Sequence, residues 1–239
     1  CGGIDASILP AAAIHRQLGL RSGTPCLELG GACTGFLSAL SLARSLVAER
    51  GAVLIVSVEA HSRVLPLSPC PVGESAALFG DGCAAAVLGS RAGEGPGVKL
   101  MDLKICVDGS AAEIIRVRPL DCGGFGLEMD GVPLTEFALH ALATATREIA
   151  AQHGHSVSNL SAIVAHGGNG RMPAMLARLL HLPATKVWSD VARTGNLGSA
   201  SVPVAWASRP VPAPGPVVWT AVGAGIAWGA ALWEIQSSP

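Results

Sequence analysis

The alternation of apolar and polar positions predicts a strand, a corner and a helix near the start of the chain. Residues 26–29 alternate as a strand does, two glycines follow, and residues 36–50 place apolar side chains three or four positions apart from Phe36 to Val47. That spacing is typical of a helix. Residues 53–58 form a continuous apolar, largely β-branched run, as in a parallel strand covered on both faces. We therefore expect a βαβ unit here.

The rest of this first part is more broken. A helix is expected from Pro10 to the glycine at position 19, and residues 62–74, which hold three prolines, predict an irregular loop. The Gly-Asp-Gly sequence at 80–82 predicts a tight turn between two strand-like pieces. Residues 91–96, rich in glycine and charge, predict a boundary.

The second part alternates apolar strands with amphipathic helices, a pattern that indicates an α/β fold. Strands are expected at 98–107, 160–165, around 187, at 217–222 and at 226–235, and helices at 133–152, at 173–182 and from 201 until Pro210 ends the last one.

One sequence feature occurs twice. The Gly-Asp-Gly turn at 80–82 precedes the apolar residues 84–88, and a Gly-Ala-Gly turn at 223–225 precedes the apolar residues 227–232. Each turn closes a block of alternating strands and helices. Two similar layered α/β halves explain this repetition.

Composition excludes several functional classes. The formal net charge is −1 with no basic stripe, so we expect no nucleic-acid partner. No apolar run reaches the roughly 18 residues of a membrane span, so no membrane is expected. The seven cysteines contain no CxxC pair, which fits neither a disulfide framework nor a metal site and favours the reducing cytoplasm. Because the chain opens on Cys1 and shows no leader, we expect a section of a longer polypeptide.

Cys33 stands at the predicted strand-to-helix corner, between small residues. Unpaired backbone N–H groups and the helix dipole favour an anion there, such as a thiolate. The alternative is a small buried hydrophobe, the usual state of a free cysteine.

Two further polar residues, His166 and Asn196, also follow predicted strands. Loops after the strands of an α/β sheet converge on one edge, where ligand sites form. Together with Cys33 they suit thioester chemistry, because a thiolate accepts an acyl group and neutral N–H donors hold an enolate oxygen. The ordinary alternatives are a surface or core histidine at 166 and a simple turn at Asn196.

Five motifs resemble, in order and separation, those of the type III β-ketoacyl-acyl-carrier-protein synthases, which are thiolase-fold condensing enzymes. The motifs are GACTGF at 31–36, LFGDG at 78–82, HGGNGRM at 166–172, GNLGSASVP at 195–203 and GAGIAWG at 223–229.

The resemblance implies a thiolase-like α/β fold with duplicated βαβαβαββ halves in α-β-α-β-α layers. Residues 1–95 would then be the remainder of a truncated first half that carries the nucleophile, and residues 96–239 a second half that carries the histidine and the asparagine. Loss of central strands would expose apolar surface, and each exposed Å² would cost about 25 cal/mol of folding free energy.

The resemblance also implies catalytic roles. Cys33 falls on the acyl-accepting cysteine, and His166 and Asn196 fall on the pair that holds the enolate oxygen. The backbone amides of Cys33 and Ala224 fall on the oxyanion hole. The implied reaction loads an acyl group on the cysteine, decarboxylates a malonyl thioester and joins the two into a 3-oxoacyl thioester.

Other positions concern substrates and partners. Asn169 and Arg171 fall where the family contacts the pantetheine arm and the acidic carrier protein, and Leu9 falls where many members close the acyl pocket with phenylalanine. A longer or branched acyl group is therefore expected. The implied partners are acyl carrier protein or coenzyme A thioesters and a second subunit, identical or homologous, with no cofactor and no metal.

Two rival functions stay open. An acyltransferase relative would pass the acyl group to oxygen or nitrogen, but it needs no enolate donor such as Asn196. A non-catalytic truncated partner subunit would fit the absent N-terminal segment, but not the intact trio of cysteine, histidine and asparagine.

Overall fold

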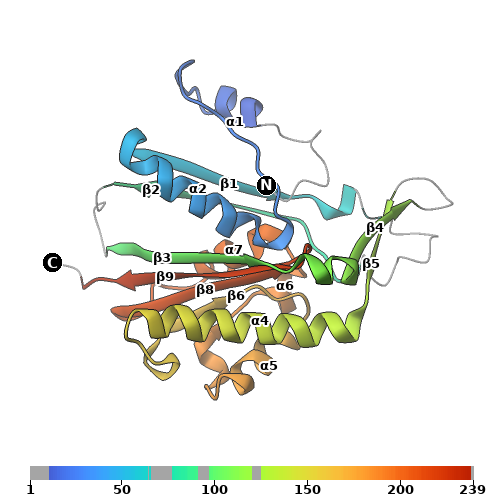
Figure 1. Cartoon of the computed structure of the whole chain (residues 1–239). Coiled ribbons are helices and arrows are strands. Elements are labelled where there is room, and N and C mark those ends of the chain that lie inside the picture. Colours follow the sequence, from blue (N-terminus) through green and yellow to red (C-terminus); the bar gives the residue numbers. More distant parts are fainter. Residues whose placement is uncertain (1–10, 64, 66–76, 91–96, 120–124, 238–239) are drawn as a thin grey trace.

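The computed structural model describes residues 11–63, 65, 77–90, 97–119 and 125–237. A five-stranded mixed sheet forms its centre (Figure 1). β6 lies parallel to β7 and β8, whereas β9 lies antiparallel to β8 and β3. The strand order is β3 (Val98–Val107), β9 (Ala227–Ile235), β8 (Gly215–Gly223), β6 (Ala162–Ala165) and β7 (Val187–Trp188).

The predicted helices are confirmed, with ends shifted by a few residues. α4 begins just before the proline at 133, a residue that the first turn of a helix tolerates because its missing N–H has no intrahelical partner. The α-helices are α1 (Ala11–Gln17), α2 (Gly35–Arg50), α4 (Gly131–Gln152), α5 (Met172–Leu179), α6 (Val191–Thr194) and α7 (Ser201–Ala207).

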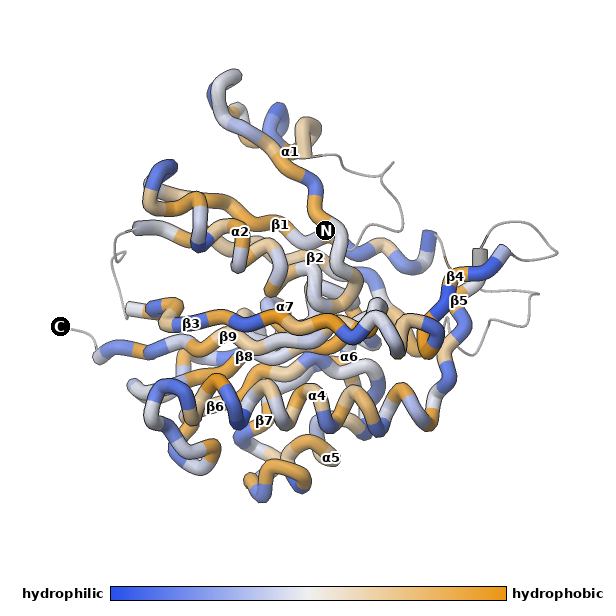
Figure 2. Tube along the Cα trace, in the orientation of Figure 1, coloured by the Kyte–Doolittle hydropathy of each residue, from blue (hydrophilic) through white to orange (hydrophobic). Residues whose placement is uncertain are grey.

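Alternate residues of β8 belong to two different cores, because successive side chains of a strand point to opposite faces. Val217 and Trp219 pack in the core beneath α2 and α7, which also holds Phe36. Val218 packs in the core beneath α4 and α5, which also holds Leu142. The central sheet is therefore covered on both faces, and Figure 2 shows hydrophobic positions along its inner strands.

A second sheet lies beyond α2 and α7 (Figure 1). It consists of β1 (Ala52–Glu59) and β2 (Gly82–Gly89), which pair antiparallel along their full length. Ile55 of β1 is buried in the core shared with α2. The described part thus stacks this pair, a helical layer, the central sheet and a second helical layer.

Two predictions for the first part are wrong. Residues 26–29 are not a strand, and Leu27 is 59% exposed, because no described strand lies beside this segment to complete a ladder. Within the described residues β1 has no parallel neighbour and pairs only with β2. The expected βαβ unit is therefore absent from them, since an apolar run sets burial but not the direction of its partner.

The turn at 80–82 also differs from its prediction. Only the piece after it, β2, is a strand, and the piece before it contributes a single parallel bridge between Phe79 and Asn196. The turn at 223–225, in contrast, joins two long antiparallel strands, β8 and β9. The motif at 80–82 therefore supports Asn196 rather than a hairpin.

One strand pair was not predicted. β4 (Ile115–Pro119) and β5 (Phe125–Met129) form an antiparallel pair, after the 3₁₀ helix η3 (Gly109–Ile114). Arg118 of β4 donates to Glu128 of β5 over 2.6 Å. Short half-exposed strands with charged positions lack the apolar periodicity that reveals a strand.

The division at residue 95 stays a prediction, because residues 91–96, like Leu9 and most of the loop at 62–74, lie outside the described residues. Among the helices that the structure describes, none has the length and apolarity needed to cross a bilayer.

We expect Leu142→Ala to lower the free energy of unfolding by about 2–5 kcal/mol, because the fully buried Leu142 leaves a cavity between α4 and the sheet. Val132→Ala, in the same helix at 71% exposure, should change it by less than about 0.5 kcal/mol. Urea denaturation measures both, and equal effects would contradict the assigned core.

Candidate active site

Cys33 lies at a sharp backbone corner that leads into α2. It is the middle residue of the 3₁₀ turn η1 (Ala32–Thr34), and Gly31 and Ala32 before it have φ of 142° and 44°. A positive φ strains alanine, and such strain gathers at functional sites. Thr34 fixes the corner, because its Oγ1 donates to the Gly31 carbonyl over 2.8 Å. The predicted corner is confirmed, but the segment before it has no regular secondary structure.

The end of β8 packs directly against this corner. A side chain at Gly223 would put its Cβ 2.9 Å from the Cys33 amide nitrogen and 3.2 Å from that of Thr34, so only glycine fits. The turn that follows contains Ala224, which is half-buried. The oxyanion role of the Cys33 and Ala224 amides stays a prediction that this close approach favours.

Asn196 is held on both sides of its backbone and by its side chain. Its N–H donates to the Leu78 carbonyl over 2.8 Å, and its carbonyl accepts from the Gly80 N–H over 3.0 Å. Its Oδ1 accepts from the Gly198 N–H over 2.8 Å. The amide oxygen is thus occupied, and the Nδ2 group is left to donate.

The Asn196 side chain lowers the pKa of the Cys33 thiol, which is the effect of a donor near the sulfur. Desolvation by burial and then the negative charge of Glu59 act against it and raise the pKa of Cys33 to about 12. At neutral pH the resting cysteine is therefore a thiol. The expectation that the corner favours a thiolate is wrong, because burial outweighs the N–H groups and the helix dipole.

His166 follows β6, as predicted, and is 4% exposed. Its backbone N–H donates to the Thr220 carbonyl of β8 over 2.9 Å. Thr220 lies three residues before Gly223, which packs against Cys33. Cys33 and His166 therefore approach the same end of β8. Burial lowers the pKa of His166 to about 4, and Nδ1 is buried with no hydrogen-bond partner. A neutral imidazole with an unpaired nitrogen is suited to act on a bound molecule.

Asn169 and Arg171 lie in the loop between His166 and α5. Asn169 Oδ1 accepts from the Arg171 N–H over 3.0 Å, which orders the loop. Arg171 is exposed and makes no ion pair with a described residue. Gly167 is required here, since a Cβ would lie 2.8 Å from the Val191 side chain.

Sequence reasoning missed a buried polar group behind the site. Glu59, at the end of β1, is 5% exposed and accepts hydrogen bonds from Ser199, just beyond Asn196. An acidic residue ending an apolar strand was the only sequence signal for it.

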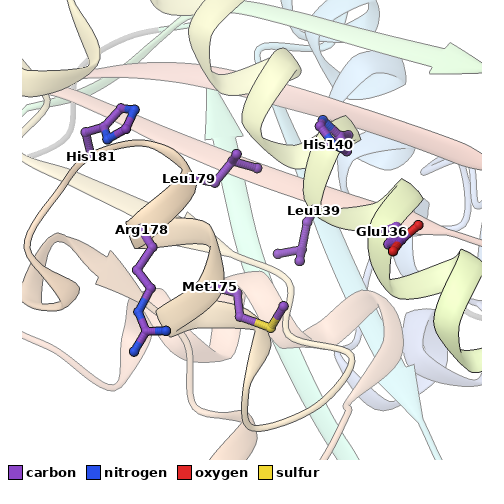
Figure 3. Close-up of a pocket in the computed structure, with 7 residues that line it drawn as sticks. All are labelled: Glu136, Leu139, His140, Met175, Arg178, Leu179 and His181. Carbon is purple, nitrogen blue, oxygen red and sulfur yellow. The ribbon is translucent and has the colours of Figure 1, made fainter.

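Other parts of the described surface carry no candidate chemistry. The described residues contain no group of three histidine, cysteine or acidic side chains able to hold a metal. An open groove of about 740 Å³ lies between α4 and α5, on the opposite face of the sheet from α2. Figure 3 shows the residues that line it, which are Glu136, Leu139, His140, Met175, Arg178, Leu179 and His181.

Two family profiles match the chain. Residues 27–109 match the profile of 3-oxoacyl-(acyl-carrier-protein) synthase III, and residues 150–235 match that of its C-terminal part. The β-ketoacyl-(acyl-carrier-protein) synthase III of Oleidesulfovibrio alaskensis is 31% identical over 93% of this chain and 71% of its own length. Synthase III 2 of Streptomyces coelicolor is 30% identical over 92% of this chain and 67% of its own length.

Solved structures agree with these matches. The 3-oxoacyl-(acyl carrier protein) synthase III of Pseudomonas aeruginosa has a TM-score of 0.84 and 29% identity over 98% of this chain and 74% of its own. The priming β-ketosynthase of a polyketide biosynthetic pathway has a TM-score of 0.82 and 29% identity over 100% of this chain and 74% of its own.

Alkylation of Cys33 by iodoacetamide should accelerate about tenfold per pH unit from about pH 7 to about pH 10 without levelling off, because a thiol of pKa about 12 stays protonated throughout. Mass spectrometry of the Cys33 peptide follows the rate, with free cysteine as the reference that levels off. A plateau near pH 9 would contradict the buried, protonated thiol.

His166 should make the fold sensitive to acid. The unfolded histidine binds a proton below about pH 6.5, whereas the folded one, with pKa about 4, stays neutral, so its contribution is full above pH 6.5 and is lost as pH falls toward 4. Urea denaturation of His166→Gln should therefore show a smaller loss of stability between pH 7 and pH 4. The exposed His140→Gln should keep the wild-type loss, and equal losses in all three would contradict the burial effect.

Proposed function

The chain belongs to the 3-oxoacyl-(acyl-carrier-protein) synthase III family of condensing enzymes, and on that premise we propose that it joins a cysteine-bound acyl group to a decarboxylating malonyl thioester. The observation that carries the proposal is the orientation of Asn196. Its Oδ1 is tied to Gly198, which leaves the amide group as the free end of the side chain, and Asn196 lowers the pKa of Cys33 as a nearby donor does. A donor facing the nucleophile suits an enolate formed beside it.

The first step loads Cys33. Its sulfur attacks the thioester carbonyl, the bond to the donor thiol breaks, and the cysteine proton leaves with that thiol. The raised pKa of Cys33 means that this proton must be removed during the step. The tetrahedral oxyanion would be held by the amides of Cys33 and Ala224, and their place around Gly223 supports that role.

The second step breaks the bond between the malonyl carboxylate and C2, releases carbon dioxide and leaves the electron pair in an enolate. We assign the two N–H donors of its oxygen to His166 and Asn196. The low pKa of His166 keeps the ring neutral, so it retains one ring nitrogen as donor and adds no charge. C2 then attacks the acyl-cysteine carbonyl, and the thiolate of Cys33 departs.

The thioester carrier is proposed to be acyl carrier protein or coenzyme A. The family resemblance implies such thioesters, and the exposed Arg171, which makes no ion pair with a described residue, offers a cation to phosphate or to an acidic protein surface. We propose a fatty-acid or a polyketide pathway as its setting, and the similarity to a polyketide priming ketosynthase supports the second of these. Dimerisation, Asn169 as a pantetheine contact and Leu9 as a pocket residue remain proposals from the family resemblance.

An acyltransferase that delivers to oxygen or nitrogen is the second candidate. It shares the loading step but has no use for a fixed enolate donor. The orientation of Asn196 by Gly198 therefore favours condensation.

We expect incubation with a panel of acyl-coenzyme A thioesters to add one acyl mass to the chain and none to Cys33→Ala, because among the cysteines that the structure describes only Cys33 combines a strained corner with adjacent N–H donors. Intact-protein mass spectrometry detects the adduct. The exposed Cys26→Ala should load like the parent. A folded parent chain that accepts no acyl group would favour the non-catalytic subunit and remove the condensation proposal.

A further inference from the structure

Glu59 is a buried carboxylate that pairs with no lysine or arginine among the described residues. It is 5% exposed, its charge acts on the Cys33 thiol, and His61 Nε2 lies 3.6 Å from its Oε2. Burying a charge is costly unless hydrogen bonds satisfy it. Stability alone would favour an apolar residue at this position. A buried acid here therefore indicates a functional role.

One carboxylate oxygen, Oε1, binds the turn after Asn196. Glu59 Oε1 accepts from the Ser199 N–H over 2.9 Å and from Ser199 Oγ over 2.5 Å, and the same hydroxyl contacts Ser57 Oγ over 2.6 Å. Gly198 lies against the carboxylate, since a Cβ there would lie 2.9 Å from its oxygen. The position of the Gly198 N–H, which orients Asn196 Oδ1, therefore depends on Glu59.

The second carboxylate oxygen, Oε2, faces His61, and His61 contacts the turn before Asn196. His61 packs on Phe79 with ring centroids 4.7 Å apart, and its Nδ1 lies 2.9 Å from the Gly80 carbonyl. The Gly80 N–H donates in turn to the Asn196 carbonyl over 3.0 Å. The side chain of Asn196 is thus fixed by a route that begins at the carboxylate, and its backbone by a turn that contacts His61, whose Nε2 lies 3.6 Å from the same carboxylate.

We propose that Glu59 is a positioning residue that, through Ser199 and His61, aims the Asn196 amide at Cys33 and at the enolate oxygen. The enolate part of this role rests on the proposed condensation. The charge of Glu59 meanwhile disfavours the Cys33 thiolate, so its value to the site lies in orienting Asn196.

Two variants separate the charge from the contact. Glu59→Gln removes the charge but keeps an acceptor oxygen for Ser199, whereas Glu59→Ala removes both. At one pH below the pKa of Cys33, iodoacetamide should alkylate the Ala variant about tenfold more slowly than the Gln variant, the value of one lost hydrogen bond to a charged group. The difference should vanish in an Asn196→Ala background. Equal rates, or a difference that survives there, would overturn the proposal, and neither result depends on condensation.

The half-reactions test the enolate part. Relative to Glu59→Gln, Glu59→Ala should slow malonyl-thioester decarboxylation by up to about 100-fold but Cys33 acylation by no more than the roughly tenfold expected for alkylation, with no further effect on either in the Asn196→Ala background. Leu142→Ala is the control for lost stability, and it should leave the ratio of the two rates unchanged. Equal slowing of both half-reactions by Glu59→Ala would overturn this part. A parent chain without either half-reaction would overturn the proposed function instead, and the alkylation result would still decide whether Glu59 positions Asn196.

Discussion

The hydrogen bond from the Gly198 N–H to Asn196 Oδ1 decides which end of the amide faces the nucleophile. An asparagine side chain is both donor and acceptor, and without this bond either end could face Cys33. With the oxygen occupied, only the donor end is free. The turn of Gly198, the carboxylate of Glu59 and the motif at 80–82 all serve this one orientation.

Burial acts on the two titratable members of the site in opposite directions and leaves both neutral. It raises the pKa of the Cys33 thiol and lowers that of the His166 imidazole. The resting site therefore holds no thiolate–imidazolium pair. Charge would appear only as a substrate reacts, on the sulfur or on the oxyanion, and fixed N–H donors are most effective at such moments.

The sequence allowed the central sheet and its helices to be predicted, because β8, β9 and α4 carry long runs with clear burial patterns. It could not specify the partners of β1 or exclude a strand at 26–29, since pairing depends on neighbours distant in the chain. Cys33, His166 and Asn196 could be proposed because each lies next to an element that the pattern reveals: Cys33 before α2, His166 after β6 and Asn196 before α7. Glu59 was missed because Ser199, its partner, lies 140 positions away, and the pKa of Cys33 was misjudged because local geometry says nothing of burial.

The most direct test of the central claim is the fate of an isotopically labelled acyl donor supplied together with an unlabelled malonyl thioester. Mass spectrometry of the thioester products should show a 3-oxoacyl thioester that carries the label at its acyl end and has lost carbon dioxide from the malonyl part, and Asn196→Ala should reduce this product far more than the acyl-enzyme. Label that remains on Cys33, or appears only as free acid or as an ester or amide, would contradict the account of Asn196 as an enolate donor.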